Sequence, residues 1–535
     1  MQDYRSREKS KGTNYNRYSK DEIIKKAFQF HSRGNIPEAT KFYQIFLNHG
    51  FLDARVNSNL GQILRDQGNL KEAELLTREA IKLDLNYADA YSNLGIILRD
   101  KGNLKEAELC TRKAIEINPN IANAHFSMGI ILRDQGNLKE AELSIRKAIE
   151  INPNIANAHF SMGIILRDQG NLKEAELYTR KAIEINPDSA TAHSNLGIIL
   201  RDQGNLKEAE LYTRKAIEIN PDSATAHSNL GIILRDLGRL KELIDLSKST
   251  LASKSINQEY KLIALIRMTI AHLLQKDYSE TILNIKKTND LINQGVIDKI
   301  KNKKNKQFSC HYSKFITSLY PLLNKENNNQ NSFKIPHVGE SHCLSFTHQN
   351  LSISSQIRKI QPVLITGGKA WHFASEKHNQ WKDSLIQQMK NHNYSEEIFI
   401  SFGEIDCRKD EGILNYTRKK NKDISEVCQK TIIGYLNYME KVLTPYYTKK
   451  YYFGVSAPLR EKEYLDDLDK KRIEVIKLYN SFLKKEVLSR GSFFIDVFAL
   501  TSNKNGENNN LHMCDQFHLA PQCISILFKD HLHKP

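Results

Sequence analysis

The sequence contains no apolar run that approaches the roughly 20 residues needed to cross a bilayer. Its first residues, MQDYRSREKSKG, are polar and charged, so they lack the apolar core of a secretory signal. Cysteine is also scarce. The seven cysteines are an odd number without a regular framework spacing, which suits a reducing compartment. We therefore expect a cytoplasmic protein without a membrane span.

The sequence also lacks the usual marks of a nucleic-acid-binding protein. The net charge is +16, but no helix-turn-helix signature, zinc-finger spacing or aromatic RNA-binding strand accompanies it. The lysines are spread along the chain and concentrated only in short patches such as residues 299–306. We interpret the charge as a solvated surface with a basic linker, and we expect no nucleic-acid partner.

What the sequence does contain is a motif that returns every 34 residues. The unit that begins at Ala156 is ANAHFSMGIILRDQGNLKEAELYTRKAIEINPDS. It predicts two amphipathic helices, separated by a Gly-Asn turn and closed by Asn-Pro. Because one helical pair cannot bury its apolar face alone, the pairs are expected to stack. The equivalent glycines are Gly61, Gly95, Gly129, Gly163, Gly197 and Gly231.

The periodic residues resemble the tetratricopeptide repeat (TPR). Gly163 would let the facing helix approach, and Ala175 and Ala182 would leave room for the next repeat. The closing prolines are Pro119, Pro153, Pro187 and Pro221. The resemblance implies an all-α solenoid over residues 21–292, with six clear repeats in residues 54–257 and degenerate capping pairs on both sides.

Residues that recur in the first helix of each repeat form ladders on the inner surface of such a solenoid. One ladder consists of Arg65, Arg99, Arg133, Arg167, Arg201 and Arg235. The other consists of Asn59, Asn93, Ser127, Ser161, Asn195 and Asn229. The second ladder resembles the asparagine ladder in the repeat domain of protein O-linked N-acetylglucosamine transferases. The resemblance implies a groove for a protein or peptide partner, because an amide side chain offers both a donor and an acceptor.

The arginine ladder has a plainer alternative. Each arginine is followed directly by an aspartate, so the ladder would be self-paired and solvated, and the array would be a passive spacer. These aspartates are Asp66, Asp100, Asp134, Asp168, Asp202 and Asp236. The two interpretations remain open at the level of sequence.

The repeat pattern ends near residue 292. Residues 293–332 contain Lys and Asn runs around one helix-compatible segment, His311 to Leu323, and we interpret them as a linker. Residues 1–20 are expected to form an N-terminal tail. With 535 residues the chain should hold at least two folding units. The second is expected over residues 333–535, where short apolar runs alternate with helix-compatible stretches, as in an α/β domain.

Five apolar runs in this second domain end in polar clusters. The runs begin at Lys334, Pro362, Ile398, Tyr451 and Phe493. The clusters are GESH, a Gly367-Gly368 pair, GEIDCR, SAPLR and, after a polar loop, HMCDQFHL. In open parallel sheets the ligand crevice lies beyond the carboxyl ends of the strands, so these clusters are expected to converge.

Ser341, Asp515 and His518 could supply a nucleophile, an orienting carboxylate and a base. Serine is a poor nucleophile unless an imidazole takes its proton, and the carboxylate holds that imidazole in the right tautomer. The Asp-x-x-His spacing lets both side chains emerge from one short loop. Alternatively, Ser341 is a loop or capping residue, and Asp515 and His518 are a structural hydrogen-bonded pair.

In these blocks, over residues 333–535, the chain resembles the SGNH (GDSL-like) hydrolases. The resemblance implies an α/β/α three-layer, flavodoxin-like domain in which Ser341, His518 and Asp515 are catalytic. It also implies an oxyanion- or substrate-binding role for Gly367, Gly368, Glu404, Asp406 and Arg408. We expect neither a cofactor nor a metal.

Two residues depart from the SGNH pattern. Glu340 stands in place of the usual Asp before the serine, which is a mild change. Ile405 stands where the family has an asparagine that donates to the oxyanion, and losing one such donor costs about 10²- to 10³-fold in rate. The backbone amides of Ser341 and the Gly367-Gly368 pair are expected to supply the remaining donors, with Arg408 as compensating positive charge.

Two clusters have alternatives outside catalysis. Glu404, Asp406 and Arg408 would equally suit an ion-pair network at the end of a strand. The cysteines within the site blocks, Cys343, Cys407 and Cys514, lie near histidines but lack a Cys-x-x-Cys pair, so we expect ordinary thiols and no metal ligands.

The leading hypothesis is a TPR-guided SGNH-like esterase or acyltransferase, with an ester, such as an O-acyl sugar, as substrate. One alternative is a scaffold whose SGNH-like domain is inactive, which Ile405 favours. A third hypothesis, an O-linked glycosyltransferase, rests on the repeats alone. Against it, residues 333–535 are too few for two nucleotide-sugar Rossmann halves and lack a Gly-rich phosphate loop.

Overall fold

A computed structural model describes residues 19–323, 333–347, 349–353, 356–365, 367–377, 379–391, 395–409, 412–459, 466–515 and 518–535. The chain divides into two compact units, Met1–Ile199 and Leu200–Pro535. Most of the expected N-terminal tail and the end of the expected linker lie outside the described residues. Among the described helices, none is both long and apolar enough to cross a membrane.

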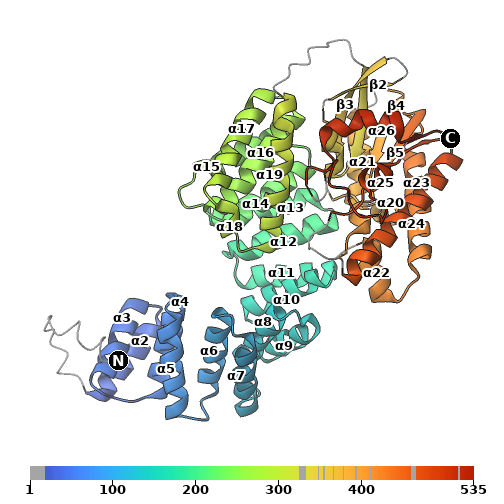
Figure 1. Cartoon of the computed structure of the whole chain (residues 1–535). Coiled ribbons are helices and arrows are strands. Elements are labelled where there is room, and N and C mark those ends of the chain that lie inside the picture. Colours follow the sequence, from blue (N-terminus) through green and yellow to red (C-terminus); the bar gives the residue numbers. More distant parts are fainter. Residues whose placement is uncertain are drawn as a thin grey trace. The chain divides into compact units, whose positions relative to one another are not determined.

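The first unit consists of antiparallel helical pairs, shown in blue to cyan in Figure 1. The pairs are α2 (Lys20–Ser32) with α3 (Ile36–Asn48), α4 (Ala54–Asp66) with α5 (Leu70–Leu83), α6 (Ala88–Asp100) with α7 (Leu104–Ile117), α8 (Ala122–Asp134) with α9 (Leu138–Ile151), and α10 (Ala156–Asp168) with α11 (Leu172–Ile185). Helix α12 (Ala190–Gln203) follows. The helical pair expected before the first clear repeat is therefore present as α2 and α3.

Each pair of the clear repeats in this unit contains two glycines with different roles. Gly170, between α10 and α11, has φ +86°, a left-handed conformation that ends α10 and favours glycine. Gly163, inside α10, lies so close to α11 that an added Cβ would overlap the Thr179 hydroxyl. That hydroxyl donates to the Ala175 carbonyl at 2.8 Å. The small residues therefore set the spacing between the two helices, as the repeat pattern predicts.

The second unit begins with further helices. They are α13 (Leu206–Ile219), α14 (Ala224–Asp236), α15 (Leu240–Ala252), α16 (Gln258–Leu274), α17 (Tyr278–Asn293), α18 (Val296–Lys299) and α19 (Lys303–Leu323). Helices α16 and α17 are the degenerate pair expected after the last clear repeat. Helix α19 is longer than the segment that the sequence indicated.

Helix α19 lies where a linker was expected, and the structure differs from that expectation. Its Phe315, Ile316 and Leu319 are at most 3% exposed. They pack with Leu262 of α16 and with Leu344 of the α/β domain in one apolar cluster. The Lys and Asn residues around them hide an apolar stripe at helical spacing, which gives α19 a buried face.

The rest of the second unit is built on one seven-stranded mixed sheet. The strands are β1 (Phe333–Gly339), β2 (Asn350–Ile353), β3 (Gln356–Leu364), β4 (Glu397–Ser401), β5 (Lys449–Phe453), β6 (Phe493–Ile495) and β7 (Leu532–His533). Their order is β2-β3-β1-β4-β5-β6-β7. The five central strands pair in parallel, and β2 and β7 add antiparallel edges. The five apolar runs are these central strands.

Helical segments cover both faces of the sheet (Figure 1). On one face, Ile398 and Ile400 join the cluster formed with α20 (Ala370–Ala374), α21 (Gln380–Asn391), α22 (Gly412–Lys420), α23 (Ile424–Leu443) and α24 (Asp467–Ser489). On the other face, Phe399 joins residues of η2 (Ser341–Phe346), α25 (Val497–Thr501), η4 (Pro521–Cys523) and α26 (Ile524–Asp530). The alternation along β4 is that of a strand buried on both sides.

The last apolar run, which begins at Phe493, divides into two elements. The Asp496 side chain accepts a hydrogen bond from the backbone N–H of Ala499 at 3.0 Å, so it ends the β6 segment and caps α25. The polar chain that carries Asp515 and His518 therefore follows a short helix.

Candidate active site

Ser341 lies directly after β1, at the first position of η2. Its backbone N–H donates to Glu340 Oε2 at 3.1 Å, and its hydroxyl donates to the same oxygen at 3.2 Å. Ser341 is 8% exposed. The serine is therefore held by the carboxylate that precedes it, at the carboxyl end of a central strand.

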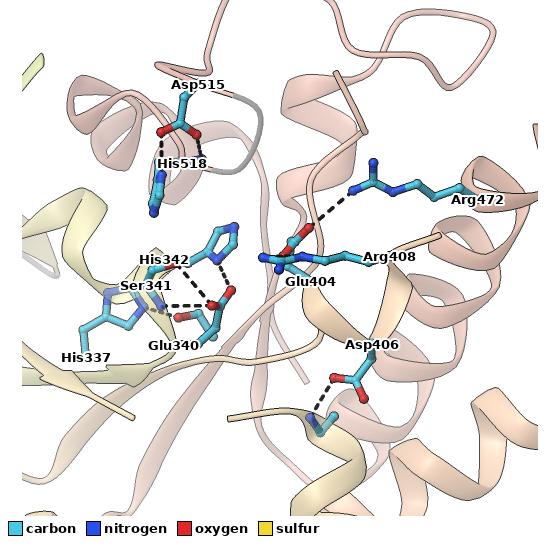
Figure 2. Close-up of polar contacts among 12 residues, drawn as sticks. His337, Glu340, Ser341, His342, Glu404, Asp406, Arg408, Arg472, Asp515 and His518 are labelled. Atoms are coloured by element: carbon cyan, nitrogen blue, oxygen red, sulfur yellow. Dashed lines mark hydrogen bonds and ion pairs between the residues drawn. The ribbon is translucent and has the colours of Figure 1, made fainter. Parts of the chain in front are cut away.

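Asp515 and His518 form a buried dyad, as Figure 2 shows. Asp515 Oδ2 lies 2.6 Å from His518 Nδ1, and Asp515 Oδ1 accepts from the backbone N–H of His518 at 2.8 Å. These two bonds fix the imidazole orientation. His518 Nε2 is buried and has no hydrogen-bond partner among the residues that the structure describes. A free Nε2 behind a carboxylate-bound Nδ1 is what a general base requires.

Three contacts bring Ser341 and His518 to the same side of the sheet. The His342 ring, adjacent to Ser341, lies 5.8 Å from the His518 ring between centroids. Ser341 is near enough to act on the pKa of the Tyr312 hydroxyl, which it lowers, and the Tyr312 ring lies 5.4 Å from the His518 ring. Ser341 and His518 therefore share neighbours, although they are far apart in the sequence. Among the described residues, the Ser341 hydroxyl donates to Glu340, and no hydrogen bond joins it to His518 Nε2.

Helix α19 supplies the residues that cover this pair. Phe315 stacks on the His518 ring with centroids 4.5 Å apart. Tyr312 is partly buried in the same apolar cluster, and burial raises the pKa of its hydroxyl, with the Glu340 charge acting in the same direction. Neither residue carries a sequence signal of a site role, although their spacing of three places them on one helix face.

Two of the amides expected to supply oxyanion donors, those of Ser341 and Gly368, already have acceptors. The Gly368 N–H donates to the Ile365 carbonyl at 3.1 Å, and the Ser341 N–H is bound to Glu340. Gly367 has φ +66°, so it forms the turn that leads from β3 to α20. An oxyanion role for the Ser341 and Gly368 amides would require these hydrogen bonds to exchange, and it stays a prediction.

Two residues of the GEIDCR block, Glu404 and Arg408, belong to an ion-pair network. This network is the alternative to a role in substrate binding that the sequence left open. Glu404 accepts from Arg408 Nε at 2.8 Å, and its other oxygen lies 3.3 Å from Arg472 Nη2. Because Glu404 already neutralises it, Arg408 offers less compensating charge than expected. Ile405, in η3 (Ile405–Cys407), is 6% exposed and has no polar atom in its side chain.

Asp406 has a different task within the same block. It accepts hydrogen bonds from the backbone N–H groups of Ala370 and Trp371 at 2.8 and 2.9 Å, at the start of α20. Burial raises the pKa of Asp406 to about 6, against the effect of these two bonds. Asp406 therefore joins the loop after β4 to the loop after β3.

The two sequence neighbours of Ser341, Glu340 and His342, also form a carboxylate–imidazole contact. Glu340 Oε1 contacts His342 Nδ1. Burial alone would raise the pKa of Glu340, but the His342 ring outweighs it and holds that pKa below its usual value. Burial would likewise lower the pKa of His342, but the Glu340 carboxylate outweighs it and raises that pKa. The two groups form a second carboxylate–imidazole pair beside the first.

Glu404 lies within 4.8 Å of this second pair, measured between the ligand-type atoms of the three side chains. A cation at that point would compete with Arg408 and Arg472 for Glu404 and with the Glu340–His342 contact. We therefore interpret the cluster as a set of internally balanced charges. All seven cysteines are free thiols, and burial raises the pKa of Cys343 and Cys407 well above the usual value.

The asparagines of the second ladder form hydrogen bonds within the protein or are buried. Asn59 Nδ2 donates to Tyr43 Oη at 3.1 Å, and Asn93 Nδ2 donates to Ser58 Oγ at 2.9 Å. Asn195 and Asn229 are 6% and 8% exposed. These amides bond neighbouring helices, so they are less available to a peptide backbone than the resemblance implied.

The arginine ladder is self-paired. Each of its six arginines forms an ion pair, at 2.6 to 3.2 Å, with the aspartate that follows it in the sequence. Arg99 also reaches Asp134 of the next repeat at 2.6 Å. The alternative of a solvated, mutually neutralised row of charges therefore describes the arginines, and a role for them in partner binding stays a prediction.

Comparisons with known proteins concern the repeats. Family models described as tetratricopeptide repeat match residues 58–83, 88–121, 122–155, 156–189 and 190–223. Among curated proteins, none matches the chain.

Three of the similar solved structures illustrate the likeness. YrrB, titled a TPR protein with an unusual peptide-binding site, has 29% identity over 32% of this chain and 90% of its own, with a TM-score of 0.27. PilF of Pseudomonas aeruginosa has 20% identity over 42% of this chain and 97% of its own, with a TM-score of 0.34. PilW, titled a type IV pilus biogenesis factor, has 19% identity over 39% and 97%, with a TM-score of 0.37. These scores are low, so nothing about function follows from them.

The matched repeats, the 34-residue helical pairs and the small residues that space them agree with one another. Over at least residues 58–223, the chain is a tetratricopeptide repeat array, a solenoid of the kind that mediates protein interactions.

Proposed function

We propose that the C-terminal α/β domain is a serine esterase or acyltransferase and that the TPR array brings its target. The observation that carries this proposal is the buried Asp515–His518 dyad, whose unpartnered Nε2 lies in the same cluster as Ser341. A hydroxyl, an imidazole and a carboxylate in this order form the minimal set for acyl transfer.

The arrangement of the domain supports the proposal. The central strands follow the order β3-β1-β4-β5-β6. Numbered among themselves, this is the order 2-1-3-4-5 of flavodoxin-like sheets, in which ligands bind beyond the carboxyl ends of the strands. Ser341 follows β1, and the Glu404 block follows β4. Their positions match the SGNH-like blocks, so the resemblance and the topology point to the same edge of the sheet.

The proposed reaction uses each member of the triad once per half-reaction. The Ser341 oxygen attacks the carbonyl carbon of an ester while its proton passes to His518 Nε2. Asp515 stabilises the imidazolium that forms. The tetrahedral intermediate then collapses, the leaving alkoxide takes the proton from His518, and an acyl-serine remains. Water or a sugar hydroxyl then attacks the acyl-serine while its proton passes to His518 Nε2. Collapse of this second intermediate returns the proton to the Ser341 oxygen and frees the serine.

A pocket on the α20 side has a lining that suits a carbohydrate, and the residues of the Ser341–His518 cluster are not among those that line it. Its volume is about 270 Å³, and its lining includes Trp371, Tyr416, Lys422 and Thr431. The Trp371 and Tyr416 rings are 5.1 Å apart, and both are more than one-third exposed. The Thr431 hydroxyl is buried with no partner among the described residues. Exposed aromatic faces beside a few polar groups suit a sugar ring.

Labelling with a fluorophosphonate tests the proposal. The full chain should be modified at Ser341, the Ser341→Ala variant should not react, and His518→Ala should react at a sharply reduced rate. Ser352→Ala, in the edge strand β2, is the matched control and should react like the wild type. A folded chain that stays unlabelled would contradict the proposal.

A non-catalytic scaffold is the second candidate, and a specific observation favours it. Both the N–H and the hydroxyl of Ser341 already donate to Glu340. If the unlabelled outcome is found, the domain binds without turnover. The glycosyltransferase hypothesis requires two nucleotide-sugar domains, whereas the described residues form one sheet.

A further inference from the structure

We infer that His342 supplies the oxyanion hydrogen bond that Ile405 cannot make. This inference rests on the proposed acyl-transfer function and names the group that would stabilise its transition state. Hydrogen-bond donors aimed at a developing oxyanion give one of the largest single contributions to acyl-transfer catalysis. A chain without the usual amide therefore needs another donor at the site.

The position of His342 satisfies this need. It directly follows Ser341 in η2, and its side chain is 12% exposed. Its Nδ1 is held by Glu340 Oε1, which fixes the ring. Its Nε2 is buried and has no hydrogen-bond partner in the described part of the chain. An oriented imidazole with one free nitrogen can direct a single N–H into the site.

The two imidazoles have opposed roles because their surroundings differ. His518 is held by Asp515 on the chain after α25, whereas His342 is held by Glu340 beside the serine. The ring centroids are 5.8 Å apart, and Figure 2 shows both rings on the Ser341 side of the Glu404 network. In the proposed step, His518 Nε2 accepts the proton of Ser341, and His342 Nε2–H donates to the carbonyl oxygen that Ser341 attacks.

His342 must be protonated to donate from Nε2 while Nδ1 donates to Glu340. The charged and titratable groups that face it are Glu340, Glu404, Arg408, His337 and His518. Burial, followed by Arg408, acts to lower the pKa of His342, whereas Glu340 and then Glu404 act to raise it. The carboxylates outweigh the other effects, so the imidazolium is favoured.

The step is balanced without a further reactant. The Ser341 oxygen forms a bond to the carbonyl carbon, its proton moves to His518 Nε2, and the carbonyl π electrons move to the oxygen. The resulting oxyanion accepts a hydrogen bond from His342 Nε2–H, which keeps its proton throughout. Collapse of the intermediate restores the carbonyl and expels the alkoxide, which takes the proton from His518.

Hydrolysis of p-nitrophenyl acetate by the full chain tests the inference. His342→Ala should lower kcat by about 10²- to 10³-fold with little change in KM. His342→Gln, whose neutral amide can donate, should recover part of this loss. His531→Ala is the control and should behave as wild type. Circular dichroism and the thermal midpoint establish that each variant is folded.

The pH profile separates a donor from a structural residue. If His342 donates as an imidazolium, the wild type should lose kcat as pH rises through the raised pKa of His342. His342→Gln should lack this alkaline limb. A His342→Ala variant with the kcat of the wild type would overturn the inference. A His342→Gln variant whose alkaline limb is unchanged would also overturn it. Inhibition by a chelator would also overturn it, because a metal would then hold the oxyanion.

Failure of the inference and failure of the proposed function give different results. If the wild type neither hydrolyses the ester nor reacts at Ser341, the acyl-transfer function is wrong and the role of His342 falls with it. If the wild type turns over and depends on Ser341 and His518 but not on His342, only the inference is wrong.

Discussion

Phe315 of α19 stacks on His518 of the α/β domain, with ring centroids 4.5 Å apart and 28° between the ring planes. The base candidate is therefore packed against a helix that lies before the sheet in the sequence. The same apolar cluster contains Cys343 and Leu344 of η2. Helices α16 to α19 and the candidate site are parts of one core, so the site should lose order if this core is weakened.

The first prediction concerns this core. Phe315 is fully buried, so Phe315→Ala should reduce the free energy of unfolding by about 3–5 kcal/mol. The measurement is the urea midpoint followed by circular dichroism. Leu511→Ala is the control, because Leu511 is 72% exposed and its loss should change stability by less than about 0.5 kcal/mol. Equal effects of the two substitutions would mean that α19 is not packed as described.

The second prediction concerns the helix spacing in the repeats. A Cβ on Gly163 would overlap the Thr179 hydroxyl, so Gly163→Ala should destabilise the protein by about 1–3 kcal/mol. Adding Thr179→Ala should recover much of this loss. At the equivalent Gly231 the nearest atom would be 3.4 Å away, so Gly231→Ala should be tolerated. Thermal midpoints compare the variants, and equal shifts for the two glycines would contradict the prediction.

The third prediction concerns Glu404. Removing its charge by Glu404→Gln would leave the largely buried Arg472 without its carboxylate, at a cost of about 3–5 kcal/mol in unfolding free energy. The matched control is Glu426→Gln, in an exposed pair with Lys430, where a loss below about 1 kcal/mol is expected. Urea titration of both variants measures the difference. A mild effect of Glu404→Gln would show that the network does not hold the loop.

The fourth prediction is a pH dependence that arises from Asp406. Its folded-state pKa of about 6 lies above its usual value, so the protonated form is favoured in the folded state. The stabilisation is complete below about pH 4 and is lost as pH rises through about 6, by an amount on the order of 2–3 kcal/mol. Unfolding free energies of the wild type and Asp406→Asn, compared from pH 4 to 7, should show this change only in the wild type. Parallel pH profiles would contradict it.

The sequence predicted those features that depend on local patterns. The 34-residue period gave the helical pairs, because Gly163 and Gly170 act through their own backbone and nearest neighbours. The five apolar runs predicted the parallel strands, because each run is itself a local pattern of buried residues. The Asp515-x-x-His518 spacing placed both side chains on one loop, and the dyad is formed within that loop.

The features that the sequence did not reveal depend on long-range packing. The buried face of α19 is hidden by Lys and Asn residues, so Tyr312 and Phe315 gave no signal of a site role. The short edge strands β2 and β7 are defined by pairing with a neighbour. The hydrogen bond from the Ser341 N–H to Glu340 depends on one side-chain rotamer, and no motif encodes it. The second imidazole, His342, was visible beside the serine, but its free nitrogen was not.

Detection of an acyl-enzyme tests the central claim most directly. After a short incubation of the full chain with p-nitrophenyl acetate and an acid quench, peptide mass spectrometry should find one acetyl group on Ser341. The adduct should be absent from Ser341→Ala and strongly reduced in His518→Ala. A folded wild-type chain that carries no acyl group on Ser341, or the same acylation in His518→Ala, would contradict the account.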